Sequence, residues 1–131
     1  MIGIDTNVLV RYIMQDDSKQ SSKATKLMES LTVEARGFVS LVSVVELVWV
    51  LGGSYDLTRR QVGQVLDVLL RTKEIVVDRA DQVLKALRVF NQGSADFADC
   101  LIHSIASSAG CDRTMTFDAG AVKSAGMTLI S

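Results

Sequence analysis

The chain alternates between short apolar segments and longer segments in which apolar residues recur at helical spacing. The first kind has the length and composition of β-strands, and in the second the apolar residues lie three or four positions apart. We expect strands at 2–4, 37–40, 75–78, 114–117 and 128–130, and helices at 6–14, 18–31, 43–54, 58–72, 80–91, 96–109 and 119–125. Strands that alternate with helices form parallel sheets covered on both faces. The pattern therefore predicts a three-layer α/β fold with a central parallel sheet of four or five strands and about seven helices.

One domain is expected over residues 1–131. The length is that of an ordinary domain, and the chain contains no proline, no low-complexity segment and no linker. Hydrogen-bonding side chains at the expected helix starts indicate N-caps at Ser18, Thr58 and Asp118. These local signals agree with the periodicity.

Composition narrows the class of protein. Apolar runs such as 47–51 are far shorter than the ~20 residues that cross a membrane. A strand that begins at residue 2 leaves no room for a signal peptide, so a cytoplasmic protein is expected. Cys100 and Cys111 match no metal-ligand or redox spacing and are expected to be reduced. The formal net charge of −1 is typical of neither a histone-like binder nor an acidic tail.

An acid follows the first expected strand directly. Ile2 and Ile4 read as strand residues, and Asp5 stands where the chain turns into a helix. In open α/β sheets this rim, at the carboxyl ends of the strands, is where ligands bind. Asp118 repeats the arrangement after the strand at 114–117, although an N-cap explains that acid equally well.

A second acid lies in an unexpected place, the middle of the helix at 43–54. That helix is apolar all round, so we expect Glu46 to be largely buried. A buried carboxylate is costly unless it is paired, capped or bound to a metal. The alternative is a capping box, in which Ser43 caps the helix and Glu46 folds back on it.

The helix at 96–109 carries two more acids and the one histidine. Asp96, Asp99 and His103 fall on one face because their spacing is i, i+3 and i+7. Acids in a first turn also complement the helix dipole, which is the alternative interpretation. A lone histidine on a polar helix face is usually solvated.

Four of these acids can converge at one edge of a parallel sheet: Asp5, Glu46, Asp99 and Asp118. Carboxylates that lie close together raise one another's pKa, and a divalent cation resolves that repulsion. Ligation by oxygen alone favours Mg²⁺ or Mn²⁺ over zinc. Such an ion lowers the pKa of a bound water and stabilises charge on a reacting phosphodiester.

The motifs around these acids resemble those of the PIN-domain nucleases, in particular the VapC-like toxins of bacterial toxin–antitoxin pairs. They are Asp5-Thr6-Asn7, Glu46 within Val-Val-Glu-Leu-Val, Asp99 within Phe-Ala-Asp-Cys-Leu-Ile, and Thr116-Phe117-Asp118. The resemblance covers nearly the whole chain and implies a metal-dependent endoribonuclease. It assigns the ion to Asp5, Glu46, Asp99 and Asp118, and the orientation of ligands and water to Thr6, Asn7 and Thr116.

Some assignments stay open. Asp96 lies one turn before Asp99 and is a second candidate ligand for the same ion or another one. Arg11 is a candidate phosphate contact. A further basic set has two interpretations and consists of Arg59, Arg60, Arg71 and Lys73. These side chains line a groove for RNA, or they form a solvated helix face. Nothing in the sequence indicates which RNA is cleaved.

Partners follow from the apolar surface and from the resemblance. Trp49 and the helices at 43–54 and 58–72 offer more apolar surface than a domain of this size usually buries. The resemblance implies two uses for it, a symmetric homodimer and a groove for a segment of a cognate antitoxin. It leads us to expect that an antitoxin arginine pairs with the acidic cluster.

Two other classes of protein remain as alternatives. A phosphatase of the haloacid-dehalogenase type also has an aspartate after its first strand, but it needs an acid two residues later, where this chain has Asn7. A catalytically silent PIN-like interaction module would explain the apolar helices without any metal.

Overall fold

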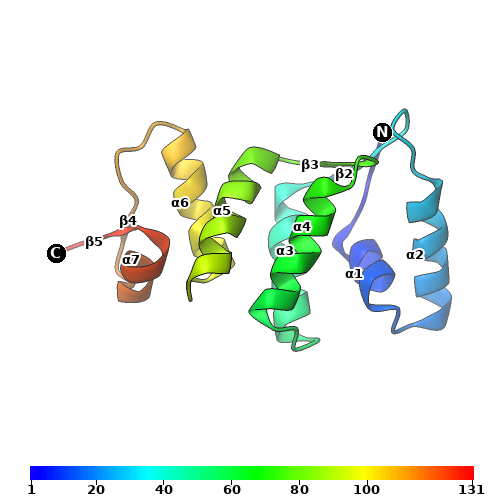
Figure 1. Cartoon of the computed structure of the whole chain (residues 1–131), viewed down its shortest axis with the longest axis horizontal. Coiled ribbons are helices and arrows are strands. Elements are labelled where there is room, and N and C mark those ends of the chain that lie inside the picture. The colour runs from blue at the N-terminus through cyan, green and yellow to red at the C-terminus, as the bar shows by residue number, and fades with distance from the viewer. The chain divides into compact units, whose positions relative to one another are not determined.

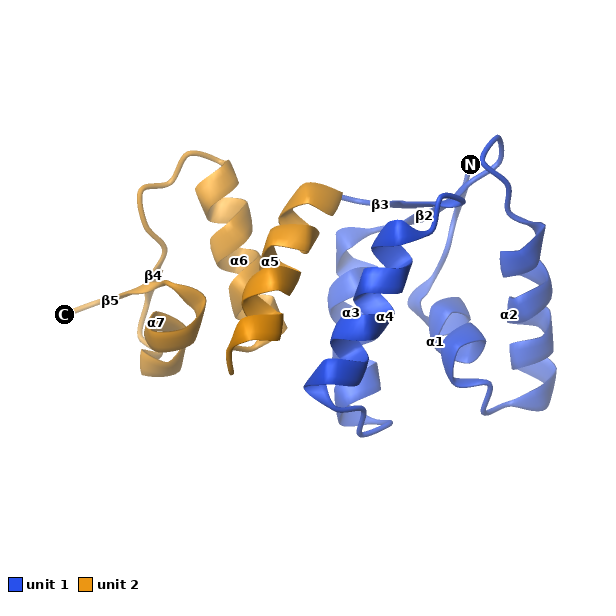
Figure 2. Ribbon diagram, viewed as in Figure 1, with its two compact units in different colours: residues 1–78 blue, residues 79–131 orange.

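The computed structural model describes residues 1–131 and divides them into two compact units, residues 1–78 and residues 79–131 (Figure 2). Unit 1 contains β1 (Ile2–Gly3), α1 (Thr6–Met14), α2 (Ser18–Ser30), β2 (Gly37–Val39), α3 (Leu41–Gly53), α4 (Arg59–Arg71) and β3 (Ile75–Val77). Unit 2 contains α5 (Ala80–Gln92), α6 (Phe97–Ser108), β4 (Met115–Thr116), α7 (Ala119–Ala125) and β5 (Thr128–Leu129).

The strands of unit 1 form a parallel sheet in the order β1-β2-β3. The central strand β2 pairs with β1 on one side and with β3 on the other. Gly37 begins β2 at a tightly packed point, where a Cβ atom would lie 2.9 Å from Ile4 Cγ1 and 3.0 Å from Leu31 Cδ1. Glycine therefore lets the end of α2 approach the sheet closely.

Four helices enclose the core of unit 1. α1 packs against α2 and α3, and α3 packs against α4 (Figure 1). The largest fully buried side chains of these helices are Leu9 of α1, Val44, Leu47 and Leu51 of α3, and Leu66 of α4. Burial of each such side chain stabilises the fold by roughly 1.5–3 kcal/mol. α3 therefore supplies much of the core from one face.

Unit 2 is built around a helix pair and a short parallel sheet. α5 and α6 pack together, and the rings of Phe90 and Phe97 meet edge to face with centroids 5.7 Å apart. β4 pairs with β5 in parallel, with Met115 opposite Thr128. α7 connects these two strands and packs on α5 and α6. Both strands of this sheet are two residues long.

The structure confirms an α/β fold with parallel strands and seven helices. All five expected strands are present, but they pair as three strands in unit 1 and two in unit 2. The backbone amides of Thr128 and Ile130 bond to Thr114 and Thr116, so β4 takes β5 as its neighbour. A single domain over residues 1–131 remains a prediction.

Helix starts agree with the sequence at two of three expected caps. Thr58 forms a complete capping box with Gln61, and Asp118 caps α7. Ser18 is not a cap, because the preceding Asp17 accepts hydrogen bonds from the amides of Lys19 and Gln20. No helix has the length and apolar composition needed to cross a membrane.

Candidate functional site

In unit 1, one threonine holds two carboxylates. Asp5 follows β1 and caps α1, where its Oδ1 accepts a hydrogen bond from the Thr6 amide at 2.8 Å. The Thr6 hydroxyl donates to Oε1 of Glu46 at 2.8 Å. Thr6 itself is only 5% exposed, so its position is fixed by packing. The side chains of Asp5 and Glu46 are thus oriented by the same residue.

The environment of Glu46 differs from the sequence prediction. Glu46 is exposed, and it lies on the same face of α3 as Val42 and Trp49, which are 69% and 77% exposed. Two apolar residues face outward there, so an apolar composition does not bury the whole helix. The expected burial of Glu46 is therefore wrong.

The alternative capping box at this helix is also absent. α3 begins at Leu41, earlier than expected, and its N-cap is Ser40, whose hydroxyl accepts from the Ser43 amide at 3.2 Å. Ser43 is consequently a buried residue inside the helix. Glu46 has its hydrogen bond with Thr6 instead.

Unit 2 carries three acids at helix starts. Asp96 caps α6, Asp99 lies in the first turn of that helix, and Asp118 caps α7. Burial raises the pKa of Asp99 above its usual value, and the negative charges of Asp96 and Asp118 raise it further. The three carboxylates therefore share one electrostatic environment.

Hydrogen bonds fix the direction of Asp118. Its Oδ1 accepts from the Gly120 amide at 2.8 Å, and its own amide donates to the Thr116 hydroxyl at 3.0 Å. Thr116 thereby shapes the turn between β4 and α7. The N-cap interpretation of Asp118 is confirmed, and the assignment of Thr116 to orienting ligands and water remains a prediction.

His103 has a packing role in unit 2. Its Nδ1 lies 2.9 Å from the hydroxyl of Thr114, so the ring is not simply solvated. Gly126 has a φ of +84°, and a Cβ atom there would lie 3.3 Å from His103 Nε2. The imidazole thus connects α6 with the segments on either side of α7.

Two candidate basic residues are engaged in ion pairs. Arg11 contacts Asp16 at 3.0 Å, Gln20 at 2.7 Å and the Tyr55 hydroxyl at 3.3 Å. The Tyr55 hydroxyl, and after it the Arg11 guanidinium, hold the pKa of Asp16 below its usual value. Arg11 therefore connects α1 with the start of α2 and with the segment that follows α3. Arg71 pairs with Asp67 at 3.0 Å.

The structure thus contains two sets of candidate site residues. Asp5, Thr6 and Glu46 form the set of unit 1, and Asn7 lies exposed in the first turn of α1 beside them. Asp96, Asp99 and Asp118 form the set of unit 2. No group of three or more His, Cys, Asp or Glu side chains is arranged to hold a metal ion. A site made from both sets remains a prediction.

No local pattern indicates the hydrogen bond between Thr6 and Glu46, because it joins residues 40 positions apart. The Arg11–Asp16–Tyr55 cluster was missed for a similar reason, since Tyr55 is 44 positions from Arg11.

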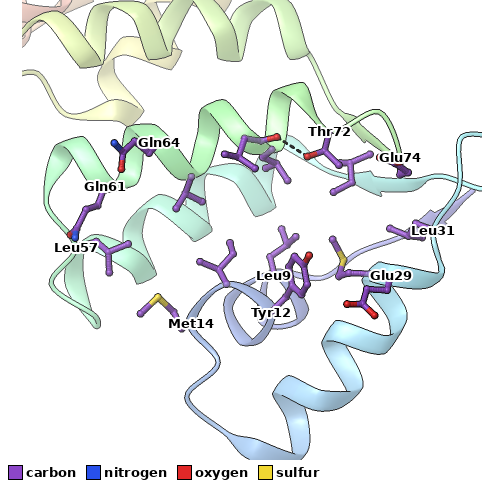
Figure 3. Close-up of a pocket in the computed structure, with 16 residues that line it drawn as sticks. Leu9, Tyr12, Met14, Glu29, Leu31, Leu57, Gln61, Gln64, Thr72 and Glu74 are labelled. Atoms are coloured by element: carbon purple, nitrogen blue, oxygen red, sulfur yellow. Dashed lines mark hydrogen bonds between the residues drawn. The ribbon is translucent and has the colours of Figure 1, made fainter.

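A pocket of about 720 Å³ lies in unit 1 between α1, α2 and α4, and we call it the α1–α2–α4 pocket (Figure 3). It is lined by Leu9, Tyr12, Ile13, Met14, Met28, Glu29, Leu31, Leu57, Gln61, Gln64, Val65, Val68, Leu69, Thr72, Glu74 and Ile75. Most of these side chains are apolar, and none belongs to the candidate acids.

Comparison with known proteins finds a matching family model and a similar solved structure. The PIN domain family model matches residues 2–126. The crystal structure of VapC20 from Mycobacterium tuberculosis, described as a sarcin-ricin loop cleaving toxin, is similar with a TM-score of 0.47. Sequence identity to it is 16%, over 98% of this chain and 97% of that chain. The comparison with curated proteins finds no match.

Proposed function

Because the chain belongs to the PIN-domain family, we propose that it is a metal-dependent endoribonuclease. The family match is the observation that carries the proposal. It spans residues 2–126 and so includes the acids of both units. The order of the acidic motifs along the chain supports the same activity.

The donor set fits a hard divalent cation. Asp5, Glu46, Asp99 and Asp118 offer only carboxylate oxygens, which Mg²⁺ and Mn²⁺ prefer. Burial, and after it the negative charges of Asp96 and Asp118, raise the pKa of Asp99, and a bound cation would favour its charged form again. The ion would lower the pKa of a water and neutralise phosphodiester charge. Asp96 is a further candidate ligand.

The protein's own residues would position this chemistry. Thr6 holds Glu46 through its hydroxyl and Asp5 through its amide, so both carboxylates are oriented before an ion binds. Thr116 holds the backbone at Asp118. Asn7 and Thr116 are proposed to orient ligands and water, with Asn7 exposed at the start of α1.

We also propose the role of toxin in a VapBC-type pair, on the strength of the motif resemblance. The antitoxin is its proposed partner, and the α1–α2–α4 pocket offers an apolar site for an antitoxin segment. A homodimer is proposed through the exposed face of α3, which carries Val42 and Trp49. An antitoxin arginine placed against the acids would compete with the metal. Removal of that arginine should weaken inhibition of RNA cleavage by the antitoxin more than it weakens binding of the antitoxin.

An RNA-cleavage assay with metal titration tests the activity. Single-stranded RNA should be cleaved with Mg²⁺ or Mn²⁺ and should stay intact with EDTA. Small phosphate monoesters serve as the control substrate, because release of phosphate from them would favour the phosphatase alternative. RNA that stays intact with every metal would contradict the nuclease and favour the interaction module.

A further inference from the structure

Polar contacts join α1 to α3 and the residues after it at two separate places. Near the start of α1, the Thr6 hydroxyl donates to Glu46 at 2.8 Å. More than one helical turn later, a rise of roughly 7–8 Å, Arg11 Nη1 donates to the Tyr55 hydroxyl at 3.3 Å. The Tyr55 amide bonds to the Val50 carbonyl of α3 at 3.3 Å. Both contacts therefore connect the same pair of helices.

The second contact belongs to a closed network, the Arg11–Asp16–Tyr55 cluster. Arg11 Nη1 lies 3.0 Å from each oxygen of the Asp16 carboxylate, and Arg11 Nε donates to Gln20 at 2.7 Å. The Tyr55 hydroxyl donates to Asp16 Oδ2 at 2.5 Å. A single exposed ion pair holds its partners weakly, whereas a network with good geometry holds them better. Each member of this cluster contacts both of the others.

The backbone beside the cluster is held in an unfavourable conformation. Gln15, which precedes Asp16, and Asp56, which follows Tyr55, both have a φ of +54°. Residues other than glycine persist in this left-handed region where surrounding contacts hold them there. The two turns carry Asp16 and Tyr55 toward each other. Their positions are therefore fixed by the cluster and not by local preference alone.

The bond between Thr6 and Glu46 is sensitive to the position of α1. Hydrogen bonds weaken steeply with poor distance and angle, and water competes for the exposed Glu46. One bond between two helices acts as a pivot, because it lets them tilt about the contact. A second contact farther along α1 removes that freedom. The cluster thus restricts motion that would separate the hydroxyl from the carboxylate.

We propose that the Arg11–Asp16–Tyr55 cluster positions Glu46, because it holds α1 so that the Thr6 hydroxyl stays within hydrogen-bonding distance of that carboxylate. Arg11, Asp16 and Tyr55 are then positioning residues, which act through Thr6 and touch neither metal nor RNA. The inference rests on the proposed nuclease function only for its effect on catalysis. It gives Arg11 a role other than contact with a phosphate.

NMR of the full chain in EDTA tests the proposal without metal or RNA. The carboxyl ¹³C signal of Glu46 reports its hydrogen bond, and Thr6→Val, which lacks the hydroxyl, marks the position of the unbonded signal. Tyr55→Phe should shift the signal part of the way toward that position. Asp67→Asn is the matched control, because it removes an exposed ion pair with Arg71 inside α4 and should leave the signal in place.

Metal binding and kinetics extend the test to the site. In Tyr55→Phe the affinity for Mn²⁺, measured by electron paramagnetic resonance without RNA, should fall about fivefold, less than the usual loss for a residue that orients a ligand directly. The kcat for RNA should fall by a similar factor, with KM unchanged. Thr6→Val combined with Tyr55→Phe should bind Mn²⁺ as weakly as Thr6→Val alone, because the cluster acts through Thr6.

Asp16→Asn keeps the size of its side chain and should shift the Glu46 signal in the same direction as Tyr55→Phe. A signal that stays in place in both variants would overturn the proposal. A further loss of Mn²⁺ affinity in the double variant would also overturn it, because the cluster would then act independently of Thr6. A higher KM with unchanged kcat would do the same, since it would assign Arg11 to the substrate.

Failure of this inference and failure of the proposed function give different results. A chain that cleaves no RNA, but whose Glu46 signal shifts in Tyr55→Phe and Asp16→Asn, would contradict the nuclease alone. A chain that cleaves RNA, but whose Glu46 signal stays in place in both variants, would contradict only this inference.

Discussion

The acids of units 1 and 2 differ in their electrostatic environment, although backbone amides cap an acid in each unit. In unit 1 a buried threonine donates a hydrogen bond to Glu46 and fixes Asp5 through its amide. In unit 2 burial raises the pKa of Asp99, and the negative charges of Asp96 and Asp118 raise it further. Hydrogen bonds orient both carboxylates of unit 1 without any ion, whereas the charged form of Asp99 in unit 2 is disfavoured, and a cation would favour it. A bound ion should therefore change the charge state of Asp99 more than the orientation of Asp5 and Glu46.

The largest expected effect is on catalysis. Asp99→Asn should lower the rate of RNA cleavage by more than about 100-fold, because it removes a charged metal ligand. In EDTA the variant should melt at the same temperature as the unsubstituted chain or higher, since the substitution removes a partly buried charge and its repulsion from Asp96 and Asp118. Cleavage assays and thermal melting check both parts.

Asp81→Asn is the matched control for that substitution. Asp81 lies in the first turn of α5, as Asp99 does in α6, and is exposed. It should retain full cleavage activity. A markedly lower melting temperature for Asp99→Asn would mean that Asp99 has a stabilising partner, and the contrast between the units would be lost.

A smaller effect is expected when the hydrogen bond of unit 1 is removed. Thr6→Val keeps the shape of a buried side chain but leaves Glu46 without its donor. We expect a loss of about 1 kcal/mol in the free energy of unfolding, because the exposed Glu46 can bind water instead. Cleavage should fall by roughly 10- to 100-fold, the usual effect of losing a residue that orients a ligand.

Thr6→Ser retains the hydroxyl and should restore most of the activity. Cleavage kinetics of the two variants report the orientation of Glu46, and chemical denaturation reports the packing of the side chain at position 6. If Thr6→Ser were as impaired as Thr6→Val, the methyl group and not the hydrogen bond would be what matters at this position.

The smallest effect concerns pH, and here the two units should respond with opposite sign. The pKa of Asp16 in unit 1 is lowered, so its contribution to stability is present above its unfolded pKa and is lost as pH falls through the folded one. The pKa of Asp99 is raised, so its contribution is present below the unfolded pKa and is lost as pH rises through the folded one. Carboxyl titrations by NMR in EDTA should show both directions.

Tyr55→Phe tests the lowered pKa of Asp16 in unit 1 separately from that of Asp99. The Tyr55 hydroxyl is the largest cause of the lowered pKa of Asp16, so this variant should move that pKa back toward its usual value. The titration of Asp99 should not change. An unaltered Asp16 titration in Tyr55→Phe would assign the shift to Arg11 instead.

Local signals in the sequence predicted the helices and strands. The division of the strands into two sheets was not predicted, because it depends on non-local contacts. Thr58 and Asp118 were recognisable as caps because a cap depends on neighbours two or three residues away. Asp17 and Ser18 are both good capping residues, so the sequence alone did not separate them. Strand pairing was predicted in direction, but the division into two sheets depends on which neighbour each strand takes.

The same distinction applies to the candidate site. The acids were found from their places after strands and at helix starts, and the structure confirms those places. The burial of Glu46 was mispredicted because helix composition does not tell which apolar face is covered, and Val42 and Trp49 lie on the open one. Arg11 pairs with Asp16 five positions away, whereas no local pattern connects it to Tyr55.

The Thr6–Glu46 bond also has a kinetic consequence. Asp5 meets the amide of the next residue, so its contact can form as soon as α1 does, on the sub-microsecond timescale of helix formation. Glu46 meets Thr6 across 40 residues, which requires closure of a long loop and docking of α3 beside α1. During refolding, the helical signal should therefore return before Glu46 is in place, and any activity that needs Glu46 should recover with a lag.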